Sequence, residues 1–94
     1  MPPSPLTESE ISSRLGLLHH WNCEGDEITR TFSFPDFRAA LAFVNKTGDL
    51  AEAAGHHPDI DIRYNKVRLA LTTHDAGGLS ARDFDLAAKI SALG

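Results

Sequence analysis

Residues 27–34 alternate between apolar and polar side chains, which is the pattern of a β-strand that buries one face. Isoleucine and phenylalanine share one side with Arg30, whereas threonine and serine occupy the other. Gly25 and Asp26 lie directly before this segment and are typical turn residues. We therefore expect a strand over 27–34 that pairs, through this turn, with a short strand around Trp21.

A second alternating segment covers residues 59–73 and continues on both sides of Asn65-Lys66. This pattern predicts a β-hairpin that turns at these two residues and buries one face. The apolar residues expected to oppose one another across the hairpin are Ile60, Ile62 and Tyr64 on the first strand and Val67, Leu69 and Leu71 on the second.

Apolar residues at helical spacing predict a first helix over residues 8–18, and a second that begins after Asp36 and ends at Gly55. The first is preceded by Thr7, which with Glu10 has the form of a capping box. Glycine in the left-handed conformation is a common end for a helix such as the second. The apolar stripe expected on the second helix consists of Phe37, Leu41, Val44 and Ala51.

A third helix is predicted after the chain break at Gly77-Gly78, with Ser80 and Asp83 as another capping box. Its apolar positions are Leu86, Ile90 and Leu93. The order is therefore helix, two strands, helix, two strands, helix. We expect an α+β fold in which a four-stranded antiparallel sheet carries three helices on one face.

The chain of 94 residues is expected to form one domain, residues 1–94, with a disordered arm over residues 1–6. Its net charge of −4, with scattered lysine and arginine, disfavours a nucleic-acid or membrane-surface partner. A single cysteine, Cys23, excludes an internal disulfide and suits a reducing compartment. No apolar run approaches the roughly 20 residues of a membrane span, and the opening segment does not resemble a secretory signal. We expect a cytoplasmic protein.

Two adjacent histidines, His56 and His57, stand between Gly55 and Pro58, where the second helix is expected to end. Proline restricts the preceding residue to an extended backbone, so this corner between helix and strand should be rigid. The negative end of the helix dipole favours protonated imidazole there. Glu52 lies one helical turn before His56, a spacing that would let it orient this ring.

His74 follows the returning strand of the predicted hairpin, which should bring it back towards His57. Three imidazoles and a carboxylate then meet at one corner. One loop histidine usually does no more than cap a backbone carbonyl, but three together favour a functional site. No nucleophile motif or phosphate-binding loop is present, so acid–base chemistry on a small, neutral or weakly polar molecule is the favoured class.

A metal site is the weaker alternative at this corner. Adjacent histidines point apart, Cys23 is distant, and no Cys-x-x-Cys or His-x-x-x-His spacing occurs. The remaining pair, His19-His20, is expected at the solvated surface. We therefore expect neither a metal nor a cofactor, and the residues alone predict a small α+β domain with a histidine-rich pocket.

Seven residues between positions 52 and 83 form a spaced motif. They are Glu52, His56, His57, Pro58, Tyr64, His74 and Asp83, with intervals of three, five, nine and eight residues between the groups. This motif resembles the signature of the pterin-4a-carbinolamine dehydratase family. The sequences YNKV, GLS-RD and HWNCEGDEITRTFSFPDF are also similar to that family, although Ile60 stands where its members often carry an aromatic residue.

That resemblance implies a hydro-lyase that removes water from a 4a-hydroxytetrahydropterin to give a quinonoid dihydropterin, in tetrahydrobiopterin recycling. It implies histidine acid–base catalysis by His56, His57 and His74. It also implies three residues that bind or orient the substrate or the catalytic groups: Glu52, Trp21 and Asp83. A single tryptophan in a small domain is more often a core residue, and Asp83 has an evident second role as the cap of its helix.

Two further expectations follow from the resemblance. The family includes a member that acts as a dimerisation cofactor for a transcription factor, so a protein-binding module is the alternative function. The family also forms homodimers or homotetramers, and its substrate comes from aromatic amino acid hydroxylases. The small core and the wide spread of apolar residues on the last helix favour self-association as well.

Overall fold

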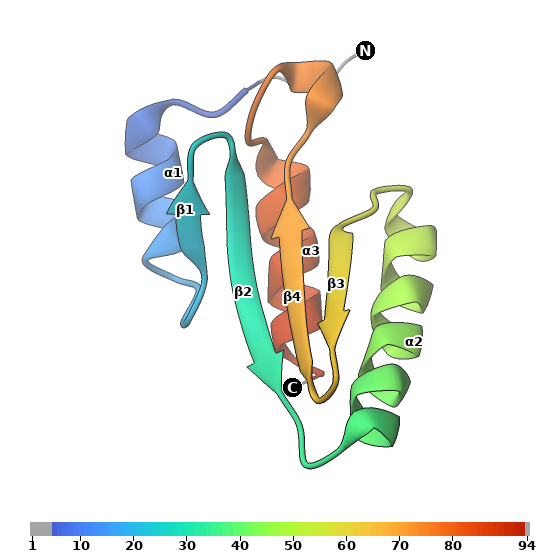
Figure 1. Ribbon diagram of the computed structural model, residues 1–94. Helices are drawn as coiled ribbons and strands as arrows, with labels where there is room; N and C mark the ends of the chain where they lie inside the picture. Colours follow the sequence, from blue (N-terminus) through green and yellow to red (C-terminus); the bar gives the residue numbers. More distant parts are fainter. Residues whose placement is uncertain (1–4, 94) are drawn as a thin grey trace.

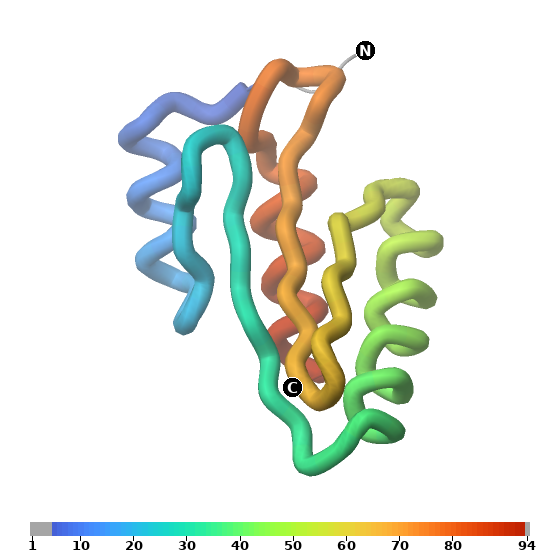
Figure 2. The backbone as a smooth tube through the Cα atoms, in the orientation of Figure 1, coloured from blue at the N-terminus to red at the C-terminus, as the bar shows by residue number. Residues whose placement is uncertain are grey.

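The computed structural model describes residues 5–93 and has the predicted α+β fold (Figure 1). The elements are α1 (Glu8–Leu15), β1 (Asn22–Glu24), β2 (Glu27–Ser33), α2 (Phe37–Ala54), β3 (Asp59–Arg63), β4 (Lys66–Leu71), the short 3-10 helix η1 (His74–Ala76) and α3 (Ala81–Ser91). The sheet has the order β1-β2-β4-β3 and is antiparallel throughout. All three helices lie on one face of it, and the tube in Figure 2 shows the two hairpins that build the sheet.

Residues 1–4 of the expected N-terminal arm lie outside the described residues. Leu6 packs against the core, and its N–H donates to the Leu79 carbonyl at 2.9 Å. The capping box of α1 is confirmed, because Thr7 and Glu10 exchange side-chain and backbone hydrogen bonds of 3.0 and 3.2 Å. The helix ends at Leu15, three residues earlier than expected, where Gly16 caps it and disfavours a further turn.

The hairpin of β3 and β4 is confirmed, but its turn is displaced by one residue from the predicted position. Tyr64 adopts a φ of 52° and forms the turn with Asn65, so that Arg63 pairs with Lys66. Asn65 explains the difference, because its side chain donates to the Phe34 carbonyl at 2.8 Å while its own carbonyl accepts from the Phe34 N–H at 2.9 Å. This tie to the end of β2 fixes the turn.

The prediction that both hairpin strands bury one face is only half right. Strand β4 is central and its apolar residues are buried, whereas every residue of the edge strand β3 is exposed. The isoleucines at 60 and 62 still pair with Leu69 and Val67, which places them on the core face of the sheet. They nevertheless remain 38% and 36% exposed at this edge of the sheet.

Helix α2 begins after Asp36, whose side chain accepts from the Ala39 N–H at 2.8 Å, and it ends at Gly55 with a left-handed φ of 62°, as predicted. Its buried face matches the predicted stripe only in part. Ala51 is buried as predicted and Val44 packs, partly buried, against the core, but Phe37 and Leu41 are 45% and 38% exposed. The other buried residues of the helix are Ala40, Phe43 and Thr47.

Aromatic packing explains this rotation of α2. The Phe43 ring lies 4.6 Å from the Phe32 ring and 4.9 Å from the Phe34 ring, measured between centroids. Large rings contribute most to a small core, so the helix turns Phe43 inwards and leaves an apolar strip on its outer side. The core also holds Trp21, whose indole N–H donates to the Ser91 hydroxyl at 2.8 Å.

Thr47 provides a test of this packing. It is fully buried in α2, and among the described residues its hydroxyl has no hydrogen-bond partner. Replacing the hydroxyl by a methyl group of similar size should remove a desolvation cost. We expect Thr47→Val to raise the free energy of unfolding by about 1 kcal/mol in urea denaturation. A loss of stability of that size would contradict the described environment.

Candidate active site

The three predicted histidines line one cavity of about 220 Å³ at the corner between α2 and β3. The left-handed Gly55 ends the helix, and the His56 N–H donates back to the Ala51 carbonyl at 3.1 Å. The end of β4 and the start of α3 supply the opposite wall. The lining residues are Gly55, His56, His57, Thr72, Thr73, His74, Asp75 and Arg82.

His56 is held by Asp83, a partner that the sequence did not predict for it. The Nε2 atom of His56 lies 2.5 Å from Oδ1 of Asp83, and their side chains are 11% and 0% exposed. The other carboxylate oxygen accepts from the Ser80 N–H at 2.9 Å and from the Thr73 hydroxyl at 2.8 Å. Asp83 therefore caps α3, as predicted, and fixes His56 at the same time.

The directions of these hydrogen bonds follow from counting protons. The Thr73 hydroxyl has one proton and donates it to Asp83, so the Ser80 hydroxyl, 2.7 Å away, must donate to Thr73. When Asp83 is ionised it can only accept, and Nε2 of His56 then carries the proton that the two groups share. Nδ1 of His56 is then the ring nitrogen available for acid–base chemistry.

Glu52 contacts His57 and not His56, which corrects the expected pairing. Its Oε2 lies 2.8 Å from Nε2 of His57, and both side chains face solvent, at 78% and 62% exposed. The reversal of the chain at Gly55 sends His56 towards α3 and leaves His57 on the side of Glu52. An exposed pair of this kind orients a ring but contributes little to stability.

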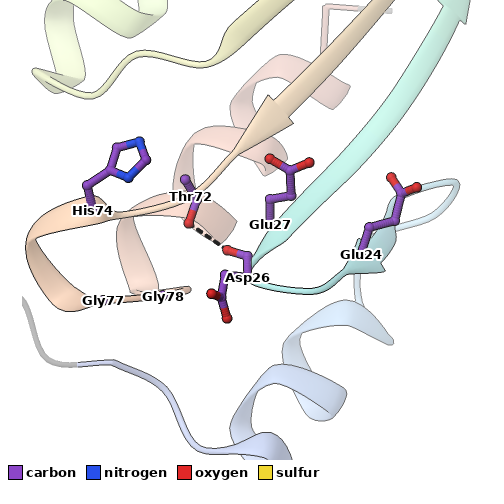
Figure 3. A pocket seen from close by; sticks show the side chains of 7 residues that line it. All are labelled: Glu24, Asp26, Glu27, Thr72, His74, Gly77 and Gly78. Carbon is purple, nitrogen blue, oxygen red and sulfur yellow. Dashed lines mark hydrogen bonds between the residues drawn. The ribbon is translucent and has the colours of Figure 1, made fainter.

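His74 lies in η1 and is exposed to solvent. It borders the histidine cavity and a second cavity of about 400 Å³ that also shares Thr72 with it. Figure 3 shows the His74 ring at one end of this second cavity and the carboxylate of Glu24 at the other, with Asp26 and Glu27 between them. The Thr72 hydroxyl donates to the Asp26 carbonyl at 2.5 Å and ties the two sides together.

This acidic cavity was not predicted, because its carboxylates come from the β1–β2 turn, far from the histidines in sequence. Glu24 accepts hydrogen bonds from the Thr29 hydroxyl and from Arg68. These contacts, the Thr29 bond above all, hold the pKa of Glu24 below its usual value. Glu24 is therefore ionised at neutral pH and adds negative charge to the cavity that His74 also lines.

Three other motif or lining residues have distinct positions. Trp21 is 4% exposed and lines none of the described cavities, so its place is in the core. Tyr64 lies at the tip of the β3–β4 turn, at the opposite end of the sheet from the histidines (Figure 1). Arg82, which sequence reasoning missed, borders the histidine cavity and an adjoining cavity of about 210 Å³ beside His56.

Within residues 5–93, no group of three or more His, Cys, Asp or Glu side chains is arranged to hold a metal ion. Acid–base chemistry by the histidines would not require a metal ion. In the same part of the chain, none of the helices has the length and apolar character needed to cross a membrane.

Together, the antiparallel sheet, the aspartate-held histidine and the shared cavity define a class of small α+β domains with an imidazole site. The family described as pterin 4 alpha carbinolamine dehydratase matches residues 4–93 by its sequence model. A protein of Acidobacterium capsulatum is 64% identical over 94% of this chain and 96% of its own length. One from Chloroflexus aurantiacus is 60% identical over 94% and 95%. Both are named, provisionally, as pterin-4-alpha-carbinolamine dehydratases.

Solved structures agree with these matches. A transcriptional coactivator/pterin dehydratase from Brucella melitensis has a TM-score of 0.91 and 37% identity, over 96% of this chain and 98% of that one. A pterin dehydratase-like protein, described as a RuBisCO assembly factor in the alpha-carboxysome, shares the fold with a TM-score of 0.69 at 24% identity, over 80% of this chain and 89% of that one. The chain belongs to the pterin-4-alpha-carbinolamine dehydratase family.

Asp83→Asn tests the described network. An amide keeps the size of the carboxylate, but its NH₂ group must face either His56 or the donors Thr73 and Ser80. We expect the free energy of unfolding to fall by about 2–3 kcal/mol, the scale of hydrogen bonds to a buried charge. Asp85→Asn, an exposed position on the same helix, is the control and should change stability by less than about 0.5 kcal/mol. Equal effects in urea denaturation would contradict the network.

Proposed function

We propose that this protein dehydrates 4a-hydroxytetrahydropterin to a quinonoid dihydropterin, and that it does so by histidine acid–base catalysis without a metal or cofactor. The observation that carries the proposal is the cavity bordered by His56, His57 and His74, two of which have a carboxylate partner. Membership of the family supports the substrate class. We further propose a cytoplasmic protein that serves a pterin-dependent hydroxylase.

The chemistry of the reaction matches the residue types. Hydroxide is a poor leaving group, so an acid must protonate the 4a-oxygen while a base removes a proton from a pterin ring nitrogen. We assign proton transfer to His56 and His57, and contact with the 4a-hydroxyl to His74. Imidazole can give or take a proton near neutral pH, so these groups need no metal to assist them.

The two proton-transfer residues are held in different ways. His56 is mostly buried and bound to a buried carboxylate, which favours one tautomer and one ring orientation. His57 is solvent-exposed and bound to an exposed carboxylate, so it can exchange protons with water. The pair therefore combines an imidazole that is held in one orientation with one that can exchange its proton with solvent after each turnover.

Stopped-flow measurement of dehydration tests the proposal directly. We expect the protein to accelerate water loss from synthetic 4a-hydroxytetrahydropterin above the spontaneous rate, with no effect of EDTA. Absence of acceleration would refute the dehydratase proposal. Loss of activity in EDTA that zinc restores would refute its metal-free form.

Substitution of the histidines tests whether they act as one unit. General acid–base groups typically contribute about 10²–10⁴-fold, so His56→Ala, His57→Ala and His74→Ala should each reduce kcat/KM on that order. The double variant His56→Ala/His57→Ala should lose less than the product of the two single losses, because both groups act on one transition state. His19→Ala, at an exposed histidine outside the cavity, is the control.

The same assay, followed across pH, separates catalysis from pocket shape. We expect kcat/KM to vary between about pH 5 and 8, where imidazole titrates. A flat profile together with fully multiplicative losses would mean that the histidines only shape the cavity.

The alternative function is a protein-binding module, such as a dimerisation cofactor or coactivator. Two observations favour keeping it: the Brucella melitensis protein is described as a transcriptional coactivator as well as a pterin dehydratase, and α2 leaves Phe37 and Leu41 exposed. Normal dehydratase rates in a variant that has lost partner binding would establish both activities as separable.

We also propose that the chain self-associates as a dimer or tetramer. The support is apolar exposure on α2 and along β3, where Phe37, Leu41, Ile60 and Ile62 are each at least 36% exposed. We expect sedimentation to give a mass above the monomer's 10.2 kDa at micromolar concentration, and Leu41→Glu to lower it. Leu17→Glu, at an exposed leucine that follows α1, away from α2 and β3 in the sequence, should have no effect. A wild-type monomer would contradict this.

A further inference from the structure

Beneath His56 lies a buried hydrogen-bonded group of three side chains: Thr73, Ser80 and Asp83. They are 3%, 1% and 0% exposed. Thr73 follows the end of β4 and directly precedes His74, whereas the other two open α3. Two of these side chains carry a hydroxyl group. The Thr73 hydroxyl donates to the Asp83 carboxylate at 2.8 Å, whereas the Ser80 hydroxyl contacts Thr73. Thr73 therefore joins the strand that leads to one catalytic histidine to the acid that holds another.

We propose that Thr73 is a positioning residue whose hydroxyl aims Asp83 at His56 and so fixes the tautomer of that ring. The role deepens the proposed dehydratase function and rests on it for its catalytic meaning. It goes beyond capping because it assigns the hydroxyl an effect on the site across two elements of structure.

The distribution of donors around Asp83 carries the argument. Oδ2 receives both the Ser80 N–H at 2.9 Å and the Thr73 hydroxyl at 2.8 Å, which leaves Oδ1 to face Nε2 of His56 at 2.5 Å. Two donors that approach from different segments fix the rotation of the carboxylate. With the Ser80 N–H alone, the carboxylate can rotate and its alignment with His56 is lost.

The backbone of Thr73 has a separate task, which makes the hydroxyl testable on its own. Its N–H donates to the Gly78 carbonyl at 3.2 Å, and its carbonyl accepts from the Gly78 N–H at 3.3 Å. This bridge closes the loop that carries His74. A change confined to the side chain should therefore disturb His56 and leave His74 in place.

The experiment compares wild type, Thr73→Val and Thr73→Ser by NMR of the histidine ring nitrogens, with kcat and KM measured on the same samples. Valine keeps the shape and removes the hydroxyl, whereas serine keeps the hydroxyl. Thr47→Val is the matched control, a buried threonine with no hydrogen-bond partner among residues 5–93. The exposed histidines His19 and His20, which lie outside the cavity, provide reference signals.

In wild type we expect neutral His56 in the Nε2–H form. In Thr73→Val we expect a second tautomer of His56, unchanged His74 signals, and a fall in kcat of about 10–100-fold with little change in KM, the scale of a misplaced catalytic group. Thr73→Ser should restore the wild-type tautomer and most of kcat. Thr47→Val should resemble wild type in both measurements.

A single Nε2–H tautomer and an unchanged kcat in folded Thr73→Val would overturn the proposal. If Thr73→Val does not fold, wild type decides: a hydroxyl proton of Thr73 protected from exchange supports the proposal, and its absence overturns it. If wild type shows no dehydration, the proposed function fails, while the tautomer comparison still tests the positioning role by itself.

Discussion

The buried carboxylate of Asp83 is the constraint on which the site depends. A charge that is fully removed from solvent is costly unless hydrogen bonds satisfy it. Here the donors come from three places in the chain: the corner after α2, the end of β4 and the first turn of α3. The native state can satisfy Asp83 only when these three segments meet. The geometry of the histidine cavity is therefore coupled to the packing of these three segments.

The two carboxylate–histidine pairs lie in different environments, one in the interior and one at the surface. Asp83 and His56 are shielded from water and fixed by neighbours, so their geometry is set before any ligand arrives. Glu52 and His57 are exposed and held mainly by each other. This asymmetry gives one imidazole that is held by a buried carboxylate and one in contact with bulk solvent, which suits the proposed reaction, because it needs an acid and a base in the same cycle.

Local signals in the sequence were sufficient for most of the fold. The Thr7 and Ser80 capping boxes, the left-handed Gly55 and the alternation of β2 each depend on neighbours within a few residues, and the structure has all of them. The details that differ depend on contacts between distant segments. The hairpin turn lies one residue before its predicted position because Asn65 binds Phe34. The buried face of α2 differs in part from the predicted stripe because Phe43 packs against the aromatic rings of β2 and the residue after it.

The same distinction applies to the site. Convergence of the histidines followed from hairpin and helix geometry, and Asp83 was foreseen as a cap. Its hydrogen bond to His56 joins residues 27 positions apart, so the spacing of the motif could not predict it. The spacing also could not predict that Glu52, near the end of a helix, contacts His57 and not His56. The acidic cavity beside His74 brings together residues from opposite halves of the chain, so it has no local signal at all.

The most direct test of this account is an NMR titration of the five histidines with a 7,8-dihydropterin, which carries the ring system of the product. Three of the histidines, His56, His57 and His74, line the cavity, while His19 and His20 lie outside it and serve as internal controls. We predict saturable shifts of the ring signals of the first three and none for the other two. Shifts at His19 and His20 alone, or no saturable shift at the three cavity histidines, would contradict the assignment of this cavity as the pterin site.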